Sequence, residues 1–325
     1  MSNNKNSGSF DISVVIPSYN RRKSISICIE SIRNQTFPPR EIIVVDDNST
    51  DDTRDVVQGI RCPDLKYLRL KRNMGAQAAR NLGIYESSGF WIAFQDSDDE
   101  WVPEKLETQV EALKTVKYDP FTVVHTDCWQ YKRSSGEKRL ISLPLINGKN
   151  IYKEILTSQG PMFPGILTSK LALKKIDYLD EKVPSYQEWD TAIRLAKHCR
   201  FIHIQKPLFF YHIHEDETIS KNTRKSIEGY QYIVDKFRDE ILFYCGRDVY
   251  NHHIVKNALR AMELGFFEDA ESILDKCVGI RLGVMLLKAL NKNRIQRAIL
   301  KRIPRCFDLF YAVHNDLIRN LRGKR

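Results

Sequence analysis

Three carboxylates lie within four residues, at Asp96, Asp98 and Asp99, directly after the apolar run at 90–95 that predicts a buried strand. So much negative charge in one place is unfavourable unless a cation neutralises it, and carboxylate oxygens are the ligands that Mg²⁺ and Mn²⁺ prefer. A divalent cation held by one or two carboxylates keeps coordination positions open for diphosphate oxygens. We therefore predict a divalent metal, Mn²⁺ or Mg²⁺, that bridges the protein and a diphosphate.

Polar residues also follow two earlier apolar runs, at 18–20 (Ser-Tyr-Asn) and at 46–49 (Asp-Asp-Asn-Ser). Ligands of open α/β sheets bind at the carboxyl ends of the strands, where these residues are expected. Each cluster alone can also be explained by turns and helix caps, since Asp, Asn and Ser are common after strands. Three such clusters at one sheet edge together predict a binding site.

The segments around these clusters alternate between strand and helix patterns. Strands are expected at 12–17, 41–45, 66–70 and 90–95, and helices at 24–35, 51–59, 75–88 and 103–117. Such an alternation forms βαβ units and a mostly parallel sheet flanked by helices. The pattern continues with a strand at 121–125, an irregular stretch at 126–184, a helix at 185–198 with Ser185 as its N-cap, and a strand at 200–204.

The chain changes character beyond about residue 222, where the pattern is helical throughout. Residues 258–274 have the pattern of a helical hairpin. The predicted organisation is a polar tail at 1–10, an α/β domain at 11–222 and an all-helical C-terminal region at 223–325. The α/β domain divides into halves at about 11–100 and about 101–222.

Most of the positive charge lies at the end of the chain. The net charge is +10, and residues 281–325 carry 12 Lys and Arg against only Asp308 and Asp316. Basic and apolar residues alternate there as in a helix that lies on an anionic membrane surface, although a solvated basic helix packed on the main domain has the same pattern. The sequence contains no zinc-ligand spacing or other nucleic-acid-binding motif, so we expect no nucleic-acid partner.

The remaining sequence features concern the cellular compartment. The seven cysteines are odd in number and include no C-x-x-C pair, as in proteins of reducing compartments. No run of 18 apolar residues occurs, and residues 1–10 lack the apolar stretch of a signal peptide. We expect a cytoplasmic protein, peripheral at the inner face of the cell membrane if the basic tail binds lipid.

Four stretches resemble, in order and spacing, the family-2 inverting glycosyltransferases of the GT-A fold, a Rossmann-like α/β fold. They are 14–21 (Val-Val-Ile-Pro-Ser-Tyr-Asn-Arg), 43–51 (Ile-Val-Val-Asp-Asp-Asn-Ser-Thr-Asp), 73–83 (Asn-x-Gly-x-x-x-Ala-Arg-Asn-x-Gly) and 94–99 (Phe-Gln-Asp-Ser-Asp-Asp). The resemblance covers roughly 10–220. It implies a nucleotide-sugar donor bound by the first half of the domain and an acceptor bound by the second half, in which we assign 126–184 to acceptor-binding loops.

The resemblance also implies roles for individual donor-site residues. Pro17 and Tyr19 would line the pocket of the nucleobase, with the tyrosine ring against the base. Asp47 would accept a hydrogen bond from the base, usually uracil. Arg80 matches a donor-site arginine of the family, although a structural salt bridge to Asp46 or Asp96 is an alternative.

The resemblance also implies a different role for each carboxylate of the acid cluster. In the family pattern Asp98 would ligate the metal directly, and Asp96 would approach the ribose or the water shell of the metal. Asp99 would cap the following turn. The D-x-D pair formed by Asp96 and Asp98 is thus the part of the cluster that we expect to act on the donor.

An inverting transfer needs a general base that deprotonates the acceptor hydroxyl. The family takes it from a sequence of the form acid-Asp-Trp-Asp, and this chain has Gln187-Glu188-Trp189-Asp190. Glu188 occupies the position of the base, with Asp190 as the fallback candidate. The chain departs from the pattern twice, because glutamine replaces the first acid and the base is one methylene longer. Trp189 would contact an acceptor sugar or lie in the core.

Two histidines lie near the end of the resemblance. His214 matches a histidine that contacts the diphosphate or metal in the family, with a surface strand residue as the alternative. His212 and His214 could also form a zinc pair, but no third ligand of that kind lies nearby in the sequence.

The predicted function is transfer of a sugar from a nucleotide-diphosphate donor, usually a UDP-sugar, to a saccharide hydroxyl. The basic tail favours a lipid-linked acceptor in surface polysaccharide synthesis. An inactive glycan- or nucleotide-binding protein of the same fold is an alternative because of Gln187. A nucleotidyltransferase is disfavoured because 18–22 contain no glycine, and a receiver domain is disfavoured because a strand and helix precede 43–48.

Overall fold

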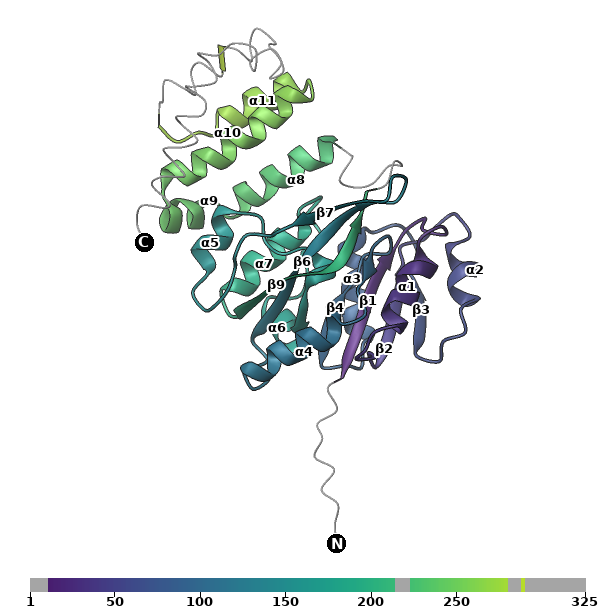
Figure 1. The fold of residues 1–325 in the computed structure, drawn as a ribbon. Coiled ribbons are helices and arrows are strands. Elements are labelled where there is room, and N and C mark those ends of the chain that lie inside the picture. Colours follow the sequence, from purple (N-terminus) through teal and green to yellow (C-terminus); the bar gives the residue numbers. More distant parts are fainter. Residues whose placement is uncertain (1–10, 214–222, 280–287, 290–325) are drawn as a thin grey trace. The chain divides into compact units, whose positions relative to one another are not determined.

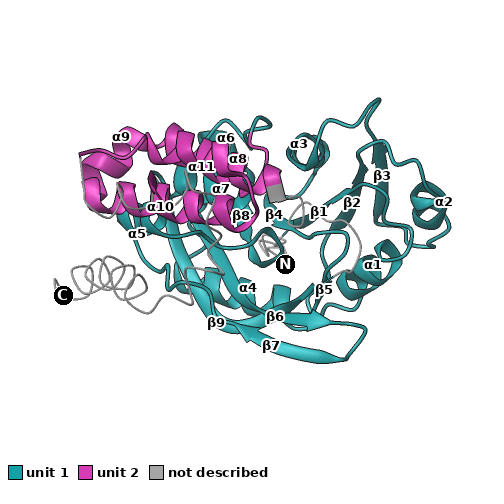
Figure 2. Ribbon diagram, turned by 90° about the horizontal axis from the view of Figure 1, so that it is seen from above, with its two compact units in different colours: residues 1–182, 187–216 teal, residues 183–186, 217–325 magenta. Residues whose placement is uncertain are grey.

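The computed structural model describes residues 11–213, 223–279 and 288–289, and the chain divides into two compact units (Figure 2). Unit 1 comprises residues 1–182 and 187–216, and unit 2 comprises residues 183–186 and 217–325. His214 and almost all of the basic tail at 281–325 lie outside the described residues. The predictions that concern them therefore stay predictions.

Unit 1 is built on one nine-stranded sheet (Figure 1). Its main order is β3-β2-β1-β4-β8-β6-β9-β5, and β7 pairs with β6. The first four strands in this order are parallel, β8 runs antiparallel to both of its neighbours, and β6 and β9 are parallel. The strands are β1 Ile12–Ser18, β2 Glu41–Asp46, β3 Leu65–Arg69, β4 Trp91–Phe94, β5 Glu100–Trp101, β6 Thr122–Lys132, β7 Glu137–Ile141, β8 Leu167–Ser169 and β9 Arg200–His212.

The helices of unit 1 follow the strands in the alternation that the sequence predicts, and they flank the sheet. They are α1 Ile25–Arg33, α2 Thr53–Gln58, α3 Ala76–Glu86, α4 Lys105–Thr115, α5 Tyr152–Thr157, α6 Lys170–Lys175 and α7 Gln187–Ala196, with a 3₁₀ turn η1 at Phe163–Gly165. The expected α/β fold with a mostly parallel sheet is thereby confirmed.

The continuous apolar runs of β1 and β2 are explained by helices on both faces of the sheet. Every residue of these two strands is buried. Ile42 and Val44 pack in the core cluster that contains the apolar side of α1, whereas Ile43 and Val45 pack with Ala79 of α3. Figure 2 shows α1 and α3 on opposite sides of the sheet. A strand covered on both faces needs apolar residues at consecutive positions.

The stretch at 126–184 is more regular than the sequence predicts. It contains the end of β6, all of β7, α5, β8 and α6. Strand β7 escapes a pattern-based prediction because four of its five residues are exposed and it lacks an apolar face. The N-cap prediction for Ser185 is wrong, because α7 begins at Gln187 and the Ser185 hydroxyl donates a hydrogen bond to the carbonyl of Lys225 in unit 2.

The described part of unit 2, residues 183–186, 223–279 and 288–289, consists mainly of helices and contains no named strand. It contains α8 Thr223–Lys236, α9 Arg238–Glu240, a π-helical turn η3 Ile241–Cys245, α10 Arg247–Glu263 and α11 Phe267–Leu274. The predicted hairpin at 258–274 is confirmed, and its turn contains Gly265 with a φ of 83°. In the core of unit 2, the hydroxyl of Tyr230 in α8 lies 2.7 Å from Nδ1 of His253 in α10.

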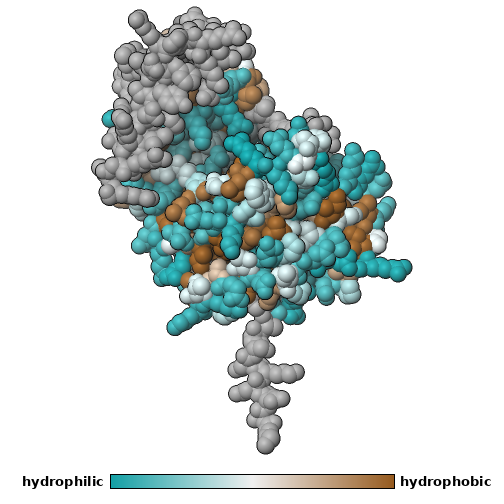
Figure 3. Space-filling model, viewed as in Figure 1, coloured by the Kyte–Doolittle hydropathy of each residue, from teal (hydrophilic) through white to brown (hydrophobic). Residues whose placement is uncertain are grey.

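The surface of the described residues is mixed in character. On the face drawn in Figure 3, hydrophilic side chains predominate and hydrophobic ones form separate patches between them, as is usual for a protein surface. Among the helices of the described ranges, none is both long and apolar enough to cross a membrane.

Close packing of α3 on the sheet leads to a first prediction. A Cβ atom at Gly83 would lie 2.5 Å from Cγ1 of Val15, so Gly83→Ala should lower the free energy of unfolding by about 1–3 kcal/mol through overpacking. Urea denaturation measures this. In a Val15→Ala background the clash is removed, and the same change should be neutral or stabilising, because alanine favours a helix over glycine by about 1 kcal/mol. Equal losses in both backgrounds would contradict this packing.

Candidate active site

The polar residues after β1 and β2 form one connected loop structure. The two strands are parallel, with Ser18 paired to Asp46 in register, and the amide of Asp47 donates to the Ser18 carbonyl at 2.8 Å. The Asn20 amide donates to Oγ of Ser49 at 2.9 Å. Asn20 and Asn48 have φ values of 53° and 63°. Asparagine is one of the few residues that adopt this left-handed conformation readily, which explains its place in both loops.

The predicted base pocket begins at the end of β1. Pro17 is buried within the strand, while Tyr19 is 42% exposed. A large aromatic side chain that remains this exposed next to a polar loop offers a ring face to a planar ligand. The structure therefore leaves Tyr19 accessible for the stacking role, with Pro17 beneath the loop as part of the sheet.

The two aspartates after β2 both bind the protein itself. Asp46 is fully buried and accepts hydrogen bonds from the amide of Ser49 at 2.7 Å and from the hydroxyl of Tyr67. Asp47 is 4% exposed and accepts from the amides of Met74 at 2.6 Å and Gly75 at 2.8 Å. Burial raises the pKa of Asp47, and the two amides partly oppose this. Asp47 thus fixes the loop that enters α3.

The three carboxylates after β4 have different partners. Asp96 forms an ion pair with Nη2 of Arg80 at 2.6 Å, and Asp98 lies 3.2 Å from Nη2 of Arg21. Asp99 is 2% exposed and accepts a hydrogen bond from the amide of His212 at 3.0 Å, so it joins the loop to the end of β9. Of the alternatives for Arg80, the structure contains the salt bridge to Asp96, which does not preclude a donor contact.

Burial and neighbouring charges shift the pKa values of the carboxylates in the cluster. Burial raises the pKa of Asp96, the nearby Asp98 raises it further, and Arg80 lowers it. Burial and both neighbouring carboxylates raise the pKa of Asp99 well above its usual value, and its Oδ2 is buried without a hydrogen-bond partner. Burial and the repulsion between neighbouring carboxylates thus both disfavour the ionised forms of Asp96 and Asp99.

The donor set restricts the kind of metal that fits. Among the described residues, no group of three His, Cys, Asp or Glu side chains is arranged to hold a metal ion by itself. The side chain of Asp98 is 19% exposed, and that of Asp96 is 32% exposed. One or two partly exposed carboxylates suit Mg²⁺ or Mn²⁺ that takes its other ligands from water and a diphosphate. The residues therefore fit a metal bound together with the donor.

Glu188 lies in the first turn of α7, close to the acid cluster. Burial raises the pKa of its carboxyl, the charge of Asp96 raises it further, and the charge of Arg80 lowers it. Both charges act on Glu188 although they lie about a hundred residues away in sequence. Arg80 is hydrogen-bonded both to Gln187, the neighbour of Glu188, and to Asp96, so the predicted base lies near the D-x-D pair. A raised pKa makes a carboxylate a stronger base.

The other two residues of this stretch are buried in the core. Trp189 is 1% exposed and its indole N–H donates to the carbonyl of Ile155 at 2.8 Å. Of the two alternatives for Trp189, the structure supports the core position and not the acceptor contact, because its ring has no surface on which a sugar could stack. Asp190 is fully buried and forms an ion pair with Nε of Arg194 at 2.9 Å. This pairing makes Asp190 the weaker candidate for the base.

His212 belongs to the end of β9 and is 4% exposed, with Nε2 3.0 Å from a carboxylate oxygen of Glu100. Its neighbour His214 lies outside the described residues, so neither its diphosphate contact nor the zinc pair is examined by the structure. The contact between His212 and Glu100 lowers the pKa of Glu100.

Two contacts of the site escape a prediction from the sequence. Arg21 reaches Asp98 from the loop after β1, and Gln187 accepts a hydrogen bond from Arg80 at 3.2 Å. Arg21 belongs to the first matching stretch, so its basic type beside an acid cluster was an available signal. Gln187 stands out in the sequence only as a departure from the family pattern.

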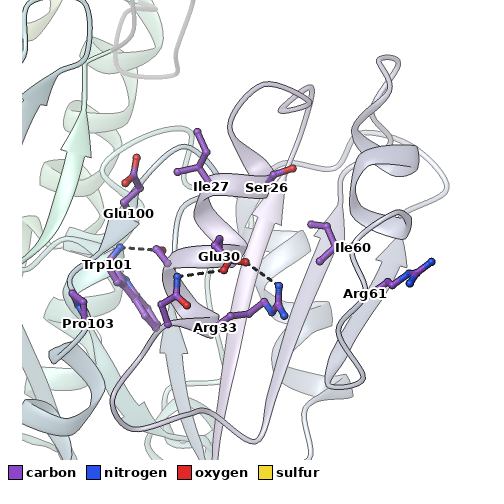
Figure 4. A pocket seen from close by; sticks show the side chains of 11 residues that line it. Ser26, Ile27, Glu30, Arg33, Ile60, Arg61, Glu100, Trp101 and Pro103 are labelled. Carbon is purple, nitrogen blue, oxygen red and sulfur yellow. Dashed lines mark hydrogen bonds and ion pairs between the residues drawn. The ribbon is translucent and has the colours of Figure 1, made fainter.

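A pocket of about 840 Å³ lies beside this region, between α1, the end of α2 and β5 (Figure 4). Its lining includes Trp101 and Glu30, and Glu30 pairs with Arg33 at 2.9 Å. None of the predicted donor, metal or base residues lines it, so this pocket is separate from the candidate active site.

Comparison with known proteins identifies relatives of the chain. The model of the family described as "Glycosyl transferase family 2" matches residues 13–175. The glycosyltransferase YwdF of Bacillus subtilis (strain 168) is 30% identical over 195 residues, which are 58% of this chain and 69% of YwdF. The Escherichia coli enzyme WfaP, described as UDP-Glc:alpha-D-GlcNAc-diphosphoundecaprenol beta-1,3-glucosyltransferase, is 40% identical over 108 residues, 33% of this chain and 42% of WfaP. The chain spans between about a third and two fifths of the length of three curated relatives that it matches.

A solved structure has the same fold. The crystal structure of S. aureus TarS 1-349 in complex with UDP-GlcNAc superimposes with a TM-score of 0.60 at 19% identity, over 87% of this chain and 88% of that one. The GT-A type of α/β fold is thus confirmed, and the receiver and nucleotidyltransferase alternatives are rejected by the family match. The four matching stretches, the fold and the sequence relatives agree, and the chain belongs to glycosyl transferase family 2.

Proposed function

We propose that the protein is an inverting, metal-dependent glycosyltransferase that moves a sugar from a UDP-sugar to a saccharide hydroxyl. The observation that carries the proposal is the position of Glu188 at the start of α7, where its neighbour Gln187 is hydrogen-bonded to Arg80, which in turn binds Asp96. A general base beside a diphosphate-binding acid cluster is the arrangement that a single displacement at a sugar carbon requires. TarS was solved with UDP-GlcNAc and WfaP is described as using UDP-Glc, which supports a uridine nucleotide.

Each residue has a defined task in this mechanism. Tyr19 stacks on the nucleobase, and Asp47 holds the loop before α3 and accepts a hydrogen bond from the base with its remaining lone pairs. Asp98, with Asp96 beside it, would hold Mn²⁺ or Mg²⁺. Bound there, the metal would neutralise charge on the leaving diphosphate as a Lewis acid. Arg80 keeps Asp96 in place from within the protein.

Glu188 acts as the general base. Its carboxylate takes the proton of the acceptor hydroxyl while the oxygen attacks the anomeric carbon on the face opposite the departing diphosphate, which inverts that carbon. The raised pKa, caused first by burial, brings the basicity of Glu188 closer to the operating pH than that of an exposed glutamate. Asp190 cannot share this task while it is paired with Arg194 in the core.

The acceptor that we propose is a lipid-linked saccharide of a bacterial surface polysaccharide. The WfaP description names a diphosphoundecaprenol acceptor, and the relative AmsB of Erwinia amylovora, 27% identical over 259 residues, is described as an amylovoran biosynthesis glycosyltransferase. The 12 basic residues at 281–325 would attract the chain to the anionic inner face of the cell membrane, where such an acceptor is presented.

A thermal-shift titration tests the donor site. UDP at a hundred times its dissociation constant should stabilise the protein by about 2.7 kcal/mol, and Mn²⁺ should increase the effect by tightening UDP binding. Asp98→Ala should abolish the Mn²⁺-dependent part, whereas Glu111→Ala, which removes an exposed acid of α4, should keep it. Absence of any stabilisation by UDP, UDP-glucose or UDP-N-acetylglucosamine would count against the proposed function.

Two isosteric variants separate the candidate bases. Glu188→Gln should retain UDP binding but release UDP from UDP-glucose or UDP-N-acetylglucosamine about 10²–10⁴-fold more slowly. Asp190→Asn should instead lower the midpoint of thermal unfolding, because it leaves Arg194 without its buried partner, and should keep most of the activity of the folded protein.

The pH dependence distinguishes these variants further. Because the pKa of Glu188 is raised, activity that requires its carboxylate should fall on acidification at a pH above 4.3, the usual value for glutamate. This acid limb should disappear in Glu188→Gln and persist in Asp190→Asn. An acid limb that survives in Glu188→Gln would assign the base to another residue.

Sedimentation with vesicles tests the membrane contact. The full chain should bind phosphatidylglycerol vesicles, with affinity that falls as salt rises. Replacing Arg294, Arg297, Lys301, Arg302 and Arg305 by glutamine should weaken binding, since each basic residue near the surface contributes about 1 kcal/mol. Replacing five exposed lysines and arginines of unit 1 is the matched control. Equal binding by both variants would remove the argument for the tail.

A further inference from the structure

Arg80 lies where three separate segments of unit 1 meet. It belongs to α3, its side chain is 6% exposed, and its guanidinium lies 4.1 Å from the centre of the Phe163 ring. Nη2 binds Asp96 at 2.6 Å, and Nη1 binds the carboxamide oxygens of Gln77 at 3.0 Å and Gln187 at 3.2 Å. Its Nε is buried without a hydrogen-bond partner. A single cation thus joins α3, the acid cluster and the start of α7.

The two glutamines that bind Nη1 differ in what they connect. Gln77 lies three residues before Arg80 on the same helix, so its hydrogen bond joins α3 only to itself. Gln187 is 107 residues away, on the helix that carries the base. The contact of Gln187 is therefore a direct link between the base-bearing helix and the donor half of the domain.

The charge at position 187 also matters for the base. Arg80 has one carboxylate among its hydrogen-bond partners, Asp96, and the other two partners are neutral amides. An acid at 187 would keep the hydrogen bond but add a negative charge beside both Arg80 and Glu188. A nearby like charge disfavours the ionised form of a carboxyl group.

The charged groups around Glu188 limit what else could set its ionisation. Asp96 and Arg80 face it from the end of β4 and from α3, while Asp190 and Arg194 on its own helix are paired with each other. Helix α5 packs on α7 through Ile155 and Leu156, and its Lys153 and Glu154 are exposed. In the loop at 176–182, Glu181 is bound to Asn81, and the carbonyls of 176 and 178 bind Arg194.

From these contacts we infer that Gln187 is a positioning residue. It holds the base-bearing helix against Arg80 by a hydrogen bond, and its neutral amide leaves the positive charge of Arg80 available to Asp96 and Glu188. The inference rests on the proposed function, since it assigns Gln187 a role in the work of Glu188.

Alanine variants test the link. Gln187→Ala should lower kcat for UDP release from UDP-glucose or UDP-N-acetylglucosamine at least about tenfold, because small misplacements of a catalytic group are costly. Gln77→Ala removes a hydrogen bond to the same nitrogen without separating α3 from α7, and should lower kcat less than about threefold. Equal losses in the two variants would overturn the link.

A glutamate variant separates geometry from charge. Gln187→Glu can accept the same hydrogen bond, so kcat on the alkaline plateau should return to within about threefold of the unaltered protein. Its acid limb should move up by about one pH unit, because the new carboxylate raises the pKa of Glu188. A purely structural role for Gln187 predicts an unshifted limb, and that result would overturn the part of the inference that concerns charge.

The effect of position 187 on the ionisation of Glu188 can also be measured without a catalytic assay. The carbon-13 signal of the Glu188 carboxyl, assigned by its loss in Glu188→Gln, should titrate about one pH unit higher in Gln187→Glu than in the unaltered chain. An equal midpoint would contradict the inference whether or not the protein turns over a donor. Failure of the unaltered chain to bind UDP or to release it would instead contradict the proposed function.

Discussion

The ion pair between Arg80 and Asp96 is the interaction on which the rest of the site depends. A guanidinium that is almost fully buried is costly unless it is paired, and this one has its carboxylate partner in the acid cluster. Removing Asp96 would leave the charge buried among Phe163 and two glutamines. The acid cluster therefore contributes to the folded domain itself, which explains why one of its carboxylates is bound inward.

The three carboxylates of the cluster each contact a different part of the domain. Asp96 is held from within by Arg80, Asp98 lies towards Arg21 in the loop after β1, and Asp99 is tied to the end of β9. Only the first two keep appreciable exposure. These two carboxylates are therefore the ones open to a ligand, whereas burial and the charges of Asp98 and Asp96 raise the pKa of Asp99 and disfavour its ionised form.

Much of the fold could be predicted because its signals are local. The runs at 12–17 and 41–45 are apolar at consecutive positions since helices cover both faces of their strands, and each ends in polar loop residues. Strand β7 could not be predicted, because it has no buried face of its own and depends on pairing with β6. The core position of Trp189 follows from packing against α5, which residues 187–190 alone do not reveal.

The site, like the fold, combines residues that have a local sequence signal with contacts that have none. Asp96 and Asp98 could be selected from residue types and spacing, and Tyr19, Asp47 and Glu188 from the resemblance to the family. The contact between Arg80 and Gln187 joins positions 107 residues apart and has no local signal. In the sequence, position 187 is marked only by its departure from the family pattern. The structure shows that Gln187 accepts a hydrogen bond from Arg80.

The hydrogen bond between Asp99 and His212 has a consequence for the order in which the protein matures during synthesis. The contacts between the loops after β1 and β2 involve only residues from the first quarter of the chain. Asp99 receives its backbone donor from a strand that emerges 113 residues later. The residues that bind one another in the loops after β1 and β2 are thus synthesised well before the backbone donor of Asp99, which exists only when about two thirds of the chain has been translated.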